Sequence, residues 1–417
     1  MPDRKDDIVI TGVGLACNLG DDAEKIAGML RRGESIPFER WEIADKLNAR
    51  CRLIGQYHGD VSDAALGIKK TQARFMGRGS RMALKVARAA IADAGCATED
   101  LAVVFGSGTG DVDTHIEVHE KLTATSDTKR LSPTVIPRLM ASTVSANLVH
   151  TLCTKGPSFS ATAACAGGNY NMLLAAQLIR SGHAKAALAG GVEVRDPNFF
   201  AGFDAMGAYA RDSNDQPERA SRPYAADRTG FVFAEGAGAV ILERREGAEA
   251  RGARIVGVLA GWGMSSDGSG EMVAPDWHGA LASMQSALRH AELDASAIDY
   301  VNTHGTSTPL GDVSEVKAMR ELFGERKVPY SSTKGYTGHT ISAAGVIESI
   351  FTMWMVQGGW VAPSVNAWPL DPQLHDFPPV TAPLDAELRY AVSSSFGFGG
   401  TNATLIFAHP LVGAQRS

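Results

Sequence analysis

The sequence has few cysteines, and their spacing excludes the common cysteine-based frameworks. The five lie at positions 17, 51, 96, 153 and 165, with no CxxC pair and no repeated spacing among them. Neither a disulfide scaffold nor a cysteine-rich zinc site is therefore indicated. Reduced thiols are typical of cytoplasmic proteins, so the cytoplasm is the expected location.

Long hydrophobic runs are also missing. The amino-terminal stretch MPDRKDDIVITGVGLA places acidic residues before a short, glycine-containing apolar run, which is unlike a secretory signal peptide. No apolar run reaches the roughly 20 residues that a membrane-spanning helix needs. We expect no association with a membrane.

Positive charge is in deficit, because 40 Lys and Arg face 46 Asp and Glu, for a formal net charge of -6. This balance argues against nucleic acid as the main partner. With 44% hydrophobic residues among 417, the chain can bury a large core, either as two domains or as one double-layered body.

Motifs for cofactors and metals are weak. GVGLAC, after the first apolar run, lacks the third glycine of a dinucleotide-binding fingerprint. His115 and His119 could share a helix face, but Glu117 is misplaced for the HExxH zinc pattern. We predict neither a cofactor nor a metal ion.

A segment around Cys165 has the composition of a nucleophile turn. Residues 159–164 are small and apolar, and from Met172 onward apolar residues recur at helical spacing until Gly182. The pattern predicts a strand, a tight turn and a helix, with the thiol near the helix amino terminus. Unpaired N–H groups and the macrodipole favour an anion there, so Cys165 is expected to be thiolate-rich and nucleophilic. The alternative is a buried structural cysteine, although the flanking alanines and glycines leave room for a ligand.

A basic cluster coincides with an amphipathic helical pattern between residues 69 and 95. Its members are Lys69, Lys70, Arg74, Arg78, Arg81, Lys85 and Arg88. One interpretation is a solvated helix face. The other is a docking surface for an acidic partner, which is more noticeable in a chain of negative net charge.

The chain resembles two copies of one α/β unit. RIVGVLAGWGMSSDG resembles the opening DIVITGVGL, ASAIDYVNTHGTSTPLGD parallels LAVVFGSGTGD, and VPYSSTKGYTGHTISAAG parallels the Cys165 segment. The charged run between Glu243 and Arg254 is the candidate boundary, which gives halves at 1–250 and 251–417. Strands alternating with helices predict largely parallel sheets, with ligands at the strand carboxyl ends where the halves meet.

Polar motifs that follow strand-like segments should fall on that shared edge. They contain Cys165, then His304 in NTHGTSTPLGD, then Lys334 and His339 in STKGYTGHTISAAGVIE. Each histidine lies in a turn of small polar residues directly after a strand, where catalytic groups are typically displayed. A fourth motif, SSSFGFGGTNATLIF, adds a glycine-rich turn between two strand-like runs.

These motifs closely resemble those of the elongating β-ketoacyl-acyl carrier protein synthases of the thiolase superfamily. The cysteine turn, NTHGTSTPLGD, STKGYTGHTISAAG and FGFGGTNA occur in the family's order, and FDAMGA and SSDGSGEMVAP are similar to its subtype I enzymes. The resemblance implies a thiolase-like α/β fold of two pseudo-repeated βαβαβ halves in α/β/α/β/α layers. It also implies an acyltransferase that condenses malonyl-acyl carrier protein with an acyl chain held on Cys165, with loss of CO₂, during fatty-acid elongation.

The resemblance implies a Cys-His-His triad. Cys165 is the expected acyl-accepting nucleophile, and His304 and His339 are expected to act in malonyl decarboxylation. Two imidazole N–H donors aimed at the thioester oxygen would stabilise the enolate left by loss of CO₂. The backbone N–H groups of Cys165 and Phe398 are expected to form the oxyanion hole for the acyl carbonyl, because the neighbouring glycines permit a close approach.

Further roles follow from the resemblance. Lys334 and Glu315 match a family ion pair that supports the histidines, although Asp312 and Glu315 would also suit a helix capping box. Substrate binding is assigned to Thr306, Thr308, Phe396 and Gly399, the wall of the acyl pocket to Thr109, and docking of the acidic acyl carrier protein to Lys70, Arg74 and Lys129. A homodimer is expected, and a heterodimer with a chain-length-factor homologue is the alternative.

Three other functions stay open at the level of sequence. The first is a ketosynthase of a specialised polyketide or aryl-polyene pathway, which no residue separates from fatty-acid elongation. The second is a non-catalytic chain-length-factor partner, which typically lacks the nucleophile that is present here as Cys165. The third is a cysteine hydrolase, which would need water at the acyl-enzyme and a Cys-His pair with no second histidine.

Overall fold

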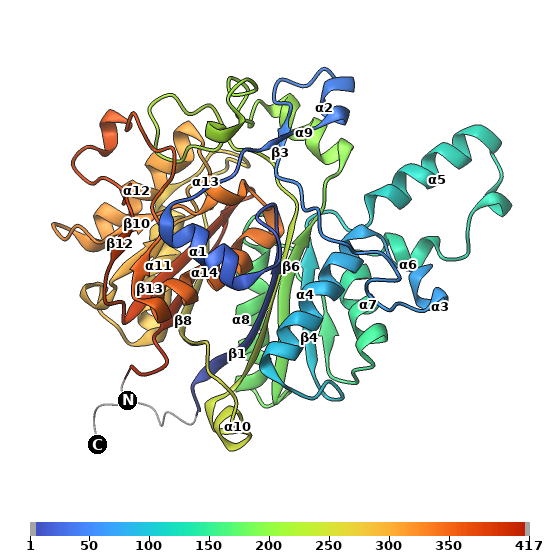
Figure 1. Cartoon of the computed structure of the whole chain (residues 1–417), viewed down its shortest axis with the longest axis horizontal. Helices are drawn as coiled ribbons and strands as arrows, with labels where there is room; N and C mark the ends of the chain where they lie inside the picture. The colour runs from blue at the N-terminus through green and yellow to red at the C-terminus, as the bar shows by residue number, and fades with distance from the viewer. Residues whose placement is uncertain (1–5, 413–417) are drawn as a thin grey trace.

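A computed structural model describes residues 6–412 and contains one ten-stranded sheet (Figure 1). The strand order is β10-β9-β13-β14-β8-β1-β7-β6-β4-β5. The strands are β1 (Ile8–Ala16), β4 (Ala102–Ser107), β5 (Ser158–Phe159), β6 (Ala186–Glu193), β7 (Gly236–Arg244), β8 (Gly257–Ser266), β9 (Tyr300–Asn302), β10 (Tyr330–Ser331), β13 (Tyr390–Gly397) and β14 (Thr401–Ala408). Two short pairs lie outside this sheet, β2 (Glu39–Arg40) with β3 (Leu53–Ile54) and β11 (Trp360–Val361) with β12 (Leu384–Asp385).

The strand order repeats between the two halves of the chain. Outward from the centre, the first half runs β1-β7-β6-β4-β5 and the second runs β8-β14-β13-β9-β10. The three sequence parallels therefore match structurally equivalent strands, β1 with β8, β4 with β9 and β5 with β10. The internal repeat predicted from the sequence is confirmed.

The prediction of largely parallel sheets was wrong for the central strands. Only the outer pairs, β5-β4-β6 and β10-β9-β13, are parallel, whereas β6-β7-β1 and β13-β14-β8 are antiparallel. The glycine-rich turn between β13 and β14 gives one reason. It spans residues 398–400, with Gly399 and Gly400 at φ 81° and 72°, and a hairpin this short joins antiparallel strands only.

Two helices fill the space between the halves of the sheet. β1 pairs with β8 only from Ile8 to Ile10, so the two halves separate beyond that point. The helices α8 (Gly167–Arg180) and α14 (Ala344–Gly358) lie between them and contact strands of both. Helix α14 is buried along almost its whole length, as its predominantly apolar sequence requires.

Helices on the outer faces complete the layers. α4 (Arg78–Ala94) and α7 (Thr143–Leu152) cover the first half, and α11 (Trp277–Ala291) with α12 (Pro309–Phe323) covers the second. The resulting α/β/α/β/α order is the one implied by the resemblance (Figure 1). The smaller helices are α1 (Ala23–Arg32), α2 (Glu42–Lys46), α3 (Lys70–Ala73), α6 (Val135–Leu139), α9 (Pro197–Met206), α10 (Arg245–Ala250) and α13 (Lys334–Thr337).

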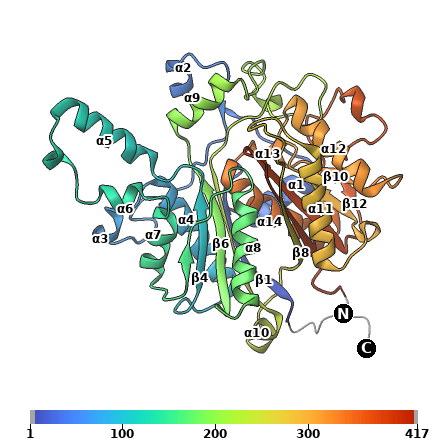
Figure 2. The same ribbon diagram turned by 180° about the vertical axis from the view of Figure 1, so that it is seen from behind.

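One segment projects away from these layers. Helix α5 (Val112–Thr125) extends beyond the body of the molecule on the side of α3 and α6, as both views show (Figures 1 and 2). Among residues 6–412, no helix combines the length and the apolar character needed to cross a membrane.

Candidate active site

Cys165 lies in a tight turn that leads into α8. The predicted strand over 159–164 is in fact only Ser158–Phe159, because residues 160–166 turn sharply to present the thiol. Ala164 has a φ of 45°, a left-handed conformation that a residue with a Cβ rarely adopts. The predicted position of the thiol is confirmed, since the helix begins two residues later at Gly167.

The expectation of a thiolate-rich Cys165 was wrong for the resting site. Cys165 is only 7% exposed, and this burial raises the pKa of the thiol to about 12. Lys334 and the backbone N–H of Phe398 lower this pKa, and Glu193 raises it, but burial has the largest effect. A pKa raised in this way favours the protonated thiol at neutral pH.

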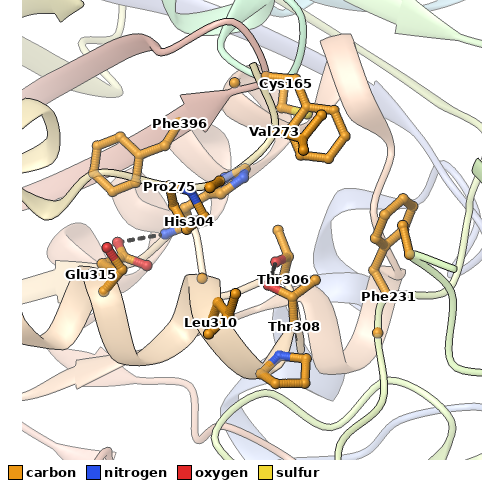
Figure 3. A pocket seen from close by; sticks show the side chains of 18 of the residues that line it. Cys165, Phe231, Val273, Pro275, His304, Thr306, Thr308, Leu310, Glu315 and Phe396 are labelled. Carbon is orange, nitrogen blue, oxygen red and sulfur yellow. Dashed lines mark hydrogen bonds between the residues drawn. The ribbon is translucent and has the colours of Figure 1, made fainter. Parts of the chain in front are cut away.

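His304 and His339 lie beside this thiol. One donor atom from each of Cys165, His304 and His339 can be chosen so that all three lie within 4.8 Å of one another. The two imidazole rings are 5.3 Å apart between centroids and almost perpendicular, at 83°. Phe231 packs edge-on against His339 and Phe396 against His304. The structure thus brings together the three residues that the sequence selected, and Figure 3 shows Cys165 and His304 of this cluster.

Both histidines are held neutral. Burial lowers the pKa of each imidazole well below its usual value, and the charge of Lys334 lowers it further. Neither Nδ1 atom has a hydrogen-bond partner within residues 6–412. One thiol and two imidazoles are ligands that a soft metal ion could use. The same groups can also serve acyl transfer, with the thiol as nucleophile and the neutral imidazoles as hydrogen-bond donors.

Lys334 has a different partner from the one expected. Its Nζ forms an ion pair with Glu348, rather than with Glu315, and donates to the carbonyl oxygen of His304 at 2.6 Å. Lys334 and Glu348 are both buried, at 1% and 2% exposure. Burial raises the pKa of Glu348 to about 7, and Lys334 opposes this rise.

Glu315 supports the site through the backbone. Its carboxylate accepts hydrogen bonds from the N–H groups of His304 and Gly305 at 2.8 and 2.9 Å (Figure 3). The alternative of a capping box between Asp312 and Glu315 was wrong. The N-cap residue of α12 is Thr308, so Asp312 and Glu315 both lie inside the helix rather than at its N-cap and third positions. Asp312 instead accepts from the N–H groups of Ser307 and Tyr224, and it pairs with Arg228.

A cavity of about 640 Å³ connects this cluster to the surface. Thr306 and Thr308 line it, with their hydroxyl oxygens 3.0 Å apart (Figure 3). Phe396 and Phe398 also line it, whereas Gly399 is not among the described lining residues and donates its N–H to the carbonyl of Met272. Exposed apolar and basic side chains surround the outer end, namely Met206, Arg211, Met272 and Leu310.

The remaining predicted residues lie away from this cavity. Thr109 is not among its described lining residues, and its hydroxyl lies 3.4 Å from Glu193. Lys70, Arg74 and Lys129 are exposed and also do not line it. Lys70 begins α3, which packs on α7 at the side of the molecule from which α5 projects (Figure 2).

Two buried carboxylates of the site were missed by sequence reasoning. Glu348 lies within α14, in the apolar run AGVIESIFTMWMV. A single acidic residue in such a run indicates a buried carboxylate that needs an oppositely charged or hydrogen-bonding partner. Glu193 ends β6 and follows the equally apolar AALAGGV. Both could have been selected as isolated acids in segments that were predicted to be buried.

Comparisons with known proteins agree with this arrangement. The chain matches the family models "Beta-ketoacyl synthase, N-terminal domain" over residues 5–248 and "Beta-ketoacyl synthase, C-terminal domain" over residues 256–367. It is 39% identical over 405 residues to 3-oxoacyl-(acyl-carrier-protein) synthase 1 of Escherichia coli (strain K12), which covers 95% of this chain and 98% of that protein.

Two solved structures extend the comparison. A beta-ketoacyl synthase from Burkholderia phymatum STM815 has a TM-score of 0.90 and 33% sequence identity, covering 97% of this chain and 99% of that one. The ishigamide ketosynthase/chain length factor has a TM-score of 0.86 and 28% identity, covering 96% of this chain and 98% of that one.

Proposed function

The chain belongs to the beta-ketoacyl synthase family, and we propose that it condenses malonyl-acyl carrier protein with an acyl chain held on Cys165. The product is 3-oxoacyl-acyl carrier protein, and the reaction elongates fatty acids. The observation that carries this proposal is the meeting of one thiol and two neutral imidazoles at the inner end of one cavity.

The first step is transfer of the acyl chain to Cys165. The sulfur attacks the thioester carbonyl of acyl-acyl carrier protein, and the thiolate of the carrier leaves. Because the thiol is protonated at rest, its proton must pass to the leaving sulfur, and a neutral imidazole beside Cys165 is suited to carry it. The backbone N–H of Phe398 lies within hydrogen-bonding reach of the sulfur, where it can also serve the oxyanion.

The second step is decarboxylation and carbon–carbon bond formation. Malonyl-acyl carrier protein loses CO₂, and the N–H groups of His304 and His339 stabilise the resulting enolate. The enolate carbon attacks the acyl carbonyl on Cys165, and the cysteine sulfur leaves and takes up a proton. Lys334 and Glu315 act on the backbone of His304 from two sides and so fix the position of its ring.

The cavity suits the arm of a carrier protein. Thr306 and Thr308 offer hydroxyl groups along its length, as an arm with amide groups requires. Lys70, Arg74 and Lys129 provide positive charge for an acidic carrier, and the exposed apolar residues at the outer end of the cavity provide contact area. The partner is therefore acyl carrier protein bearing acyl or malonyl groups.

We also propose that the protein is a cytoplasmic homodimer, that its halves divide at residue 250, and that Thr109 forms a wall of the acyl pocket. The two family models, which end at residue 248 and begin at residue 256, support the division. Retention of Cys165 with both histidines speaks against a non-catalytic chain-length factor.

The direct test offers a panel of acyl-carrier proteins with malonyl-carrier protein to the purified enzyme and weighs the products. We expect 3-oxoacyl-carrier protein one malonyl-derived unit longer than the substrate, and none from Cys165→Ala. Free fatty acid without a longer product would identify a hydrolase instead. A product set restricted to polyunsaturated or polyketide chains would assign a specialised pathway.

A further inference from the structure

The internal repeat gives Cys165 a structural counterpart in the other half of the chain. Cys165 lies two residues before the first residue of α8, and Ser342 lies two residues before the first residue of α14. The residues preceding them, Ala164 and Ile341, have nearly the same left-handed φ, at 45° and 44°. Cys165 and Ser342 thus occupy equivalent turns at the starts of the two central helices.

The surroundings of the two turns differ. Cys165 faces the cavity, whereas Ser342 is 4% exposed and faces the carboxylate of Glu193. Its hydroxyl lies 2.9 Å from Glu193 Oε2 and from the carbonyl oxygen of Val192. In the turn at Ser342, the buried carboxylate of Glu193, at the end of β6, therefore occupies the side on which the Cys165 turn faces the cavity.

Glu193 collects hydrogen bonds from two segments. Besides the Ser342 hydroxyl, its Oε2 accepts from the N–H of Gly108 at 3.1 Å and from the N–H of Ser342 at 3.4 Å. Its Oε1 lies 3.4 Å from the hydroxyl of Thr109. A Cβ at Gly108 would lie 2.5 Å from the carboxylate, so this loop approaches Glu193 as closely as glycine permits.

Ser342 lies close to two of the reacting groups. Ser342 follows His339 by three residues, and His339 is held on its other side by its N–H bond to the carbonyl of Val232. A Cβ at Gly167, two residues after Cys165, would contact Ser342 at 3.4 Å. Displacement of Ser342 would therefore be transmitted to His339 and to the nucleophile turn together.

We propose that Glu193 is a positioning residue for condensation. It ties the Gly108–Thr109 loop to Ser342 and thereby sets the spacing between His339 and Cys165. This inference rests on the proposed condensation reaction. Burial raises the pKa of Glu193 to about 7, and the hydrogen bonds from Ser342, Gly108 and Thr109 oppose this rise.

The test compares Glu193→Gln with Glu243→Gln. Glu243 is also buried, at 5%, and pairs with Thr11 and Arg251 at the opposite end of the same β6-β7 ladder. An amide at 193 keeps the size of the side chain but cannot accept from all of its present donors. We expect kcat of condensation to fall by about 10- to 100-fold, with the KM for carrier-bound substrate within about twofold, because the cavity mouth is untouched.

A second measurement separates this role from general loss of packing. The charges that act on the Cys165 sulfur are those of Lys334 and Glu193, since His304 and His339 are neutral. Removing the carboxylate charge should shift the pH profile of iodoacetamide alkylation of Cys165 to lower pH. Glu243→Gln should leave both kcat and that profile at their wild-type values.

If Glu193→Gln does not fold, Ser342→Ala removes the hydrogen bond between Ser342 and Glu193 and leaves the carboxylate in place. It should lower kcat with little change in KM. Wild-type kcat in the folded variants, or a loss equal to that of Glu243→Gln, would overturn the role of Glu193. Absence of any 3-oxoacyl product from the wild-type enzyme would instead overturn the proposed function, so the two failures are distinguishable.

Discussion

Loss of the ion pair between Lys334 and Glu348 should lower both the stability of the fold and the rate of condensation. Both side chains are buried, and Lys334 also donates to the carbonyl of His304. Glu348→Gln removes the negative charge and leaves an ammonium group in a dry site. Breaking a buried pair from one side typically costs about 3–5 kcal/mol, since the surviving charge has lost its compensation.

The measurement is equilibrium urea denaturation of both proteins at neutral pH. We expect a clear decrease of the midpoint for Glu348→Gln. The same substitution at Glu42, whose pair with Lys46 is exposed at 82% and 69%, should leave the midpoint almost unchanged. The double variant Lys334→Met with Glu348→Leu should recover much of the stability, because it removes both buried charges. It should not recover condensation, since the bond to the His304 carbonyl is gone. Equal midpoints for Glu348→Gln and Glu42→Gln would refute the reasoning.

Five further predictions concern the reaction and its substrates. Cys165→Ala should abolish acyl transfer but keep malonyl binding, as measured by binding of malonyl-carrier protein, and a loss of both would contradict separate roles. Because burial raises the pKa of Cys165 to about 12, its alkylation rate should rise with pH throughout the range above neutral, and a plateau below pH 7 would show a thiolate. His304→Ala and His339→Ala should each slow decarboxylation by about 10²–10³ and slow acylation less, because the remaining imidazole can still carry the thiol proton, and wild-type decarboxylation would make that histidine structural. Lys70→Glu should raise the KM for carrier-bound substrate and flatten its salt dependence, whereas an unchanged KM would make this helix a solvated face. Thr109→Gly should favour longer acyl chains and Thr109→Phe shorter ones, with each methylene worth about 0.8 kcal/mol, and unchanged product profiles would remove Thr109 from the pocket.

Local patterns predicted the units of the fold well. The segment DIVITGVGL, which opens the first repeat, forms β1, and the apolar spacing from Met172 onward belongs to α8. The spacing of apolar residues along a strand or helix depends on which of its faces is buried, so it can be read from the segment alone. The direction of a strand relative to its neighbours cannot, which is why the sequence predicted largely parallel sheets although β7 and β14 are antiparallel to their neighbours.

The same limit applies to the site. The positions of Cys165, His304 and His339 followed from strand-end motifs, because strand ends of the two halves meet at one edge. The partner of Lys334 did not follow, since Glu348 lies 14 residues away in a helix whose orientation only the packed structure reveals. The state of the thiol was predicted wrongly because helix position can be read locally, whereas burial depends on every layer around it.

The neutrality of the two histidines bears on how decarboxylation can be fast. A pair of imidazolium ions would bind the malonyl carboxylate strongly, and this would stabilise the ground state that must be destroyed. Neutral N–H donors interact more weakly with the carboxylate, but they can point at the thioester oxygen, where negative charge develops as CO₂ leaves. Lys334 lowers the pKa of both imidazoles without pointing its own charge at the substrate, because its Nζ is bound by Glu348 and the His304 carbonyl. Burial is the larger cause of this neutrality, so we expect both donors to stay neutral even in a variant in which Glu348 no longer pairs with Lys334.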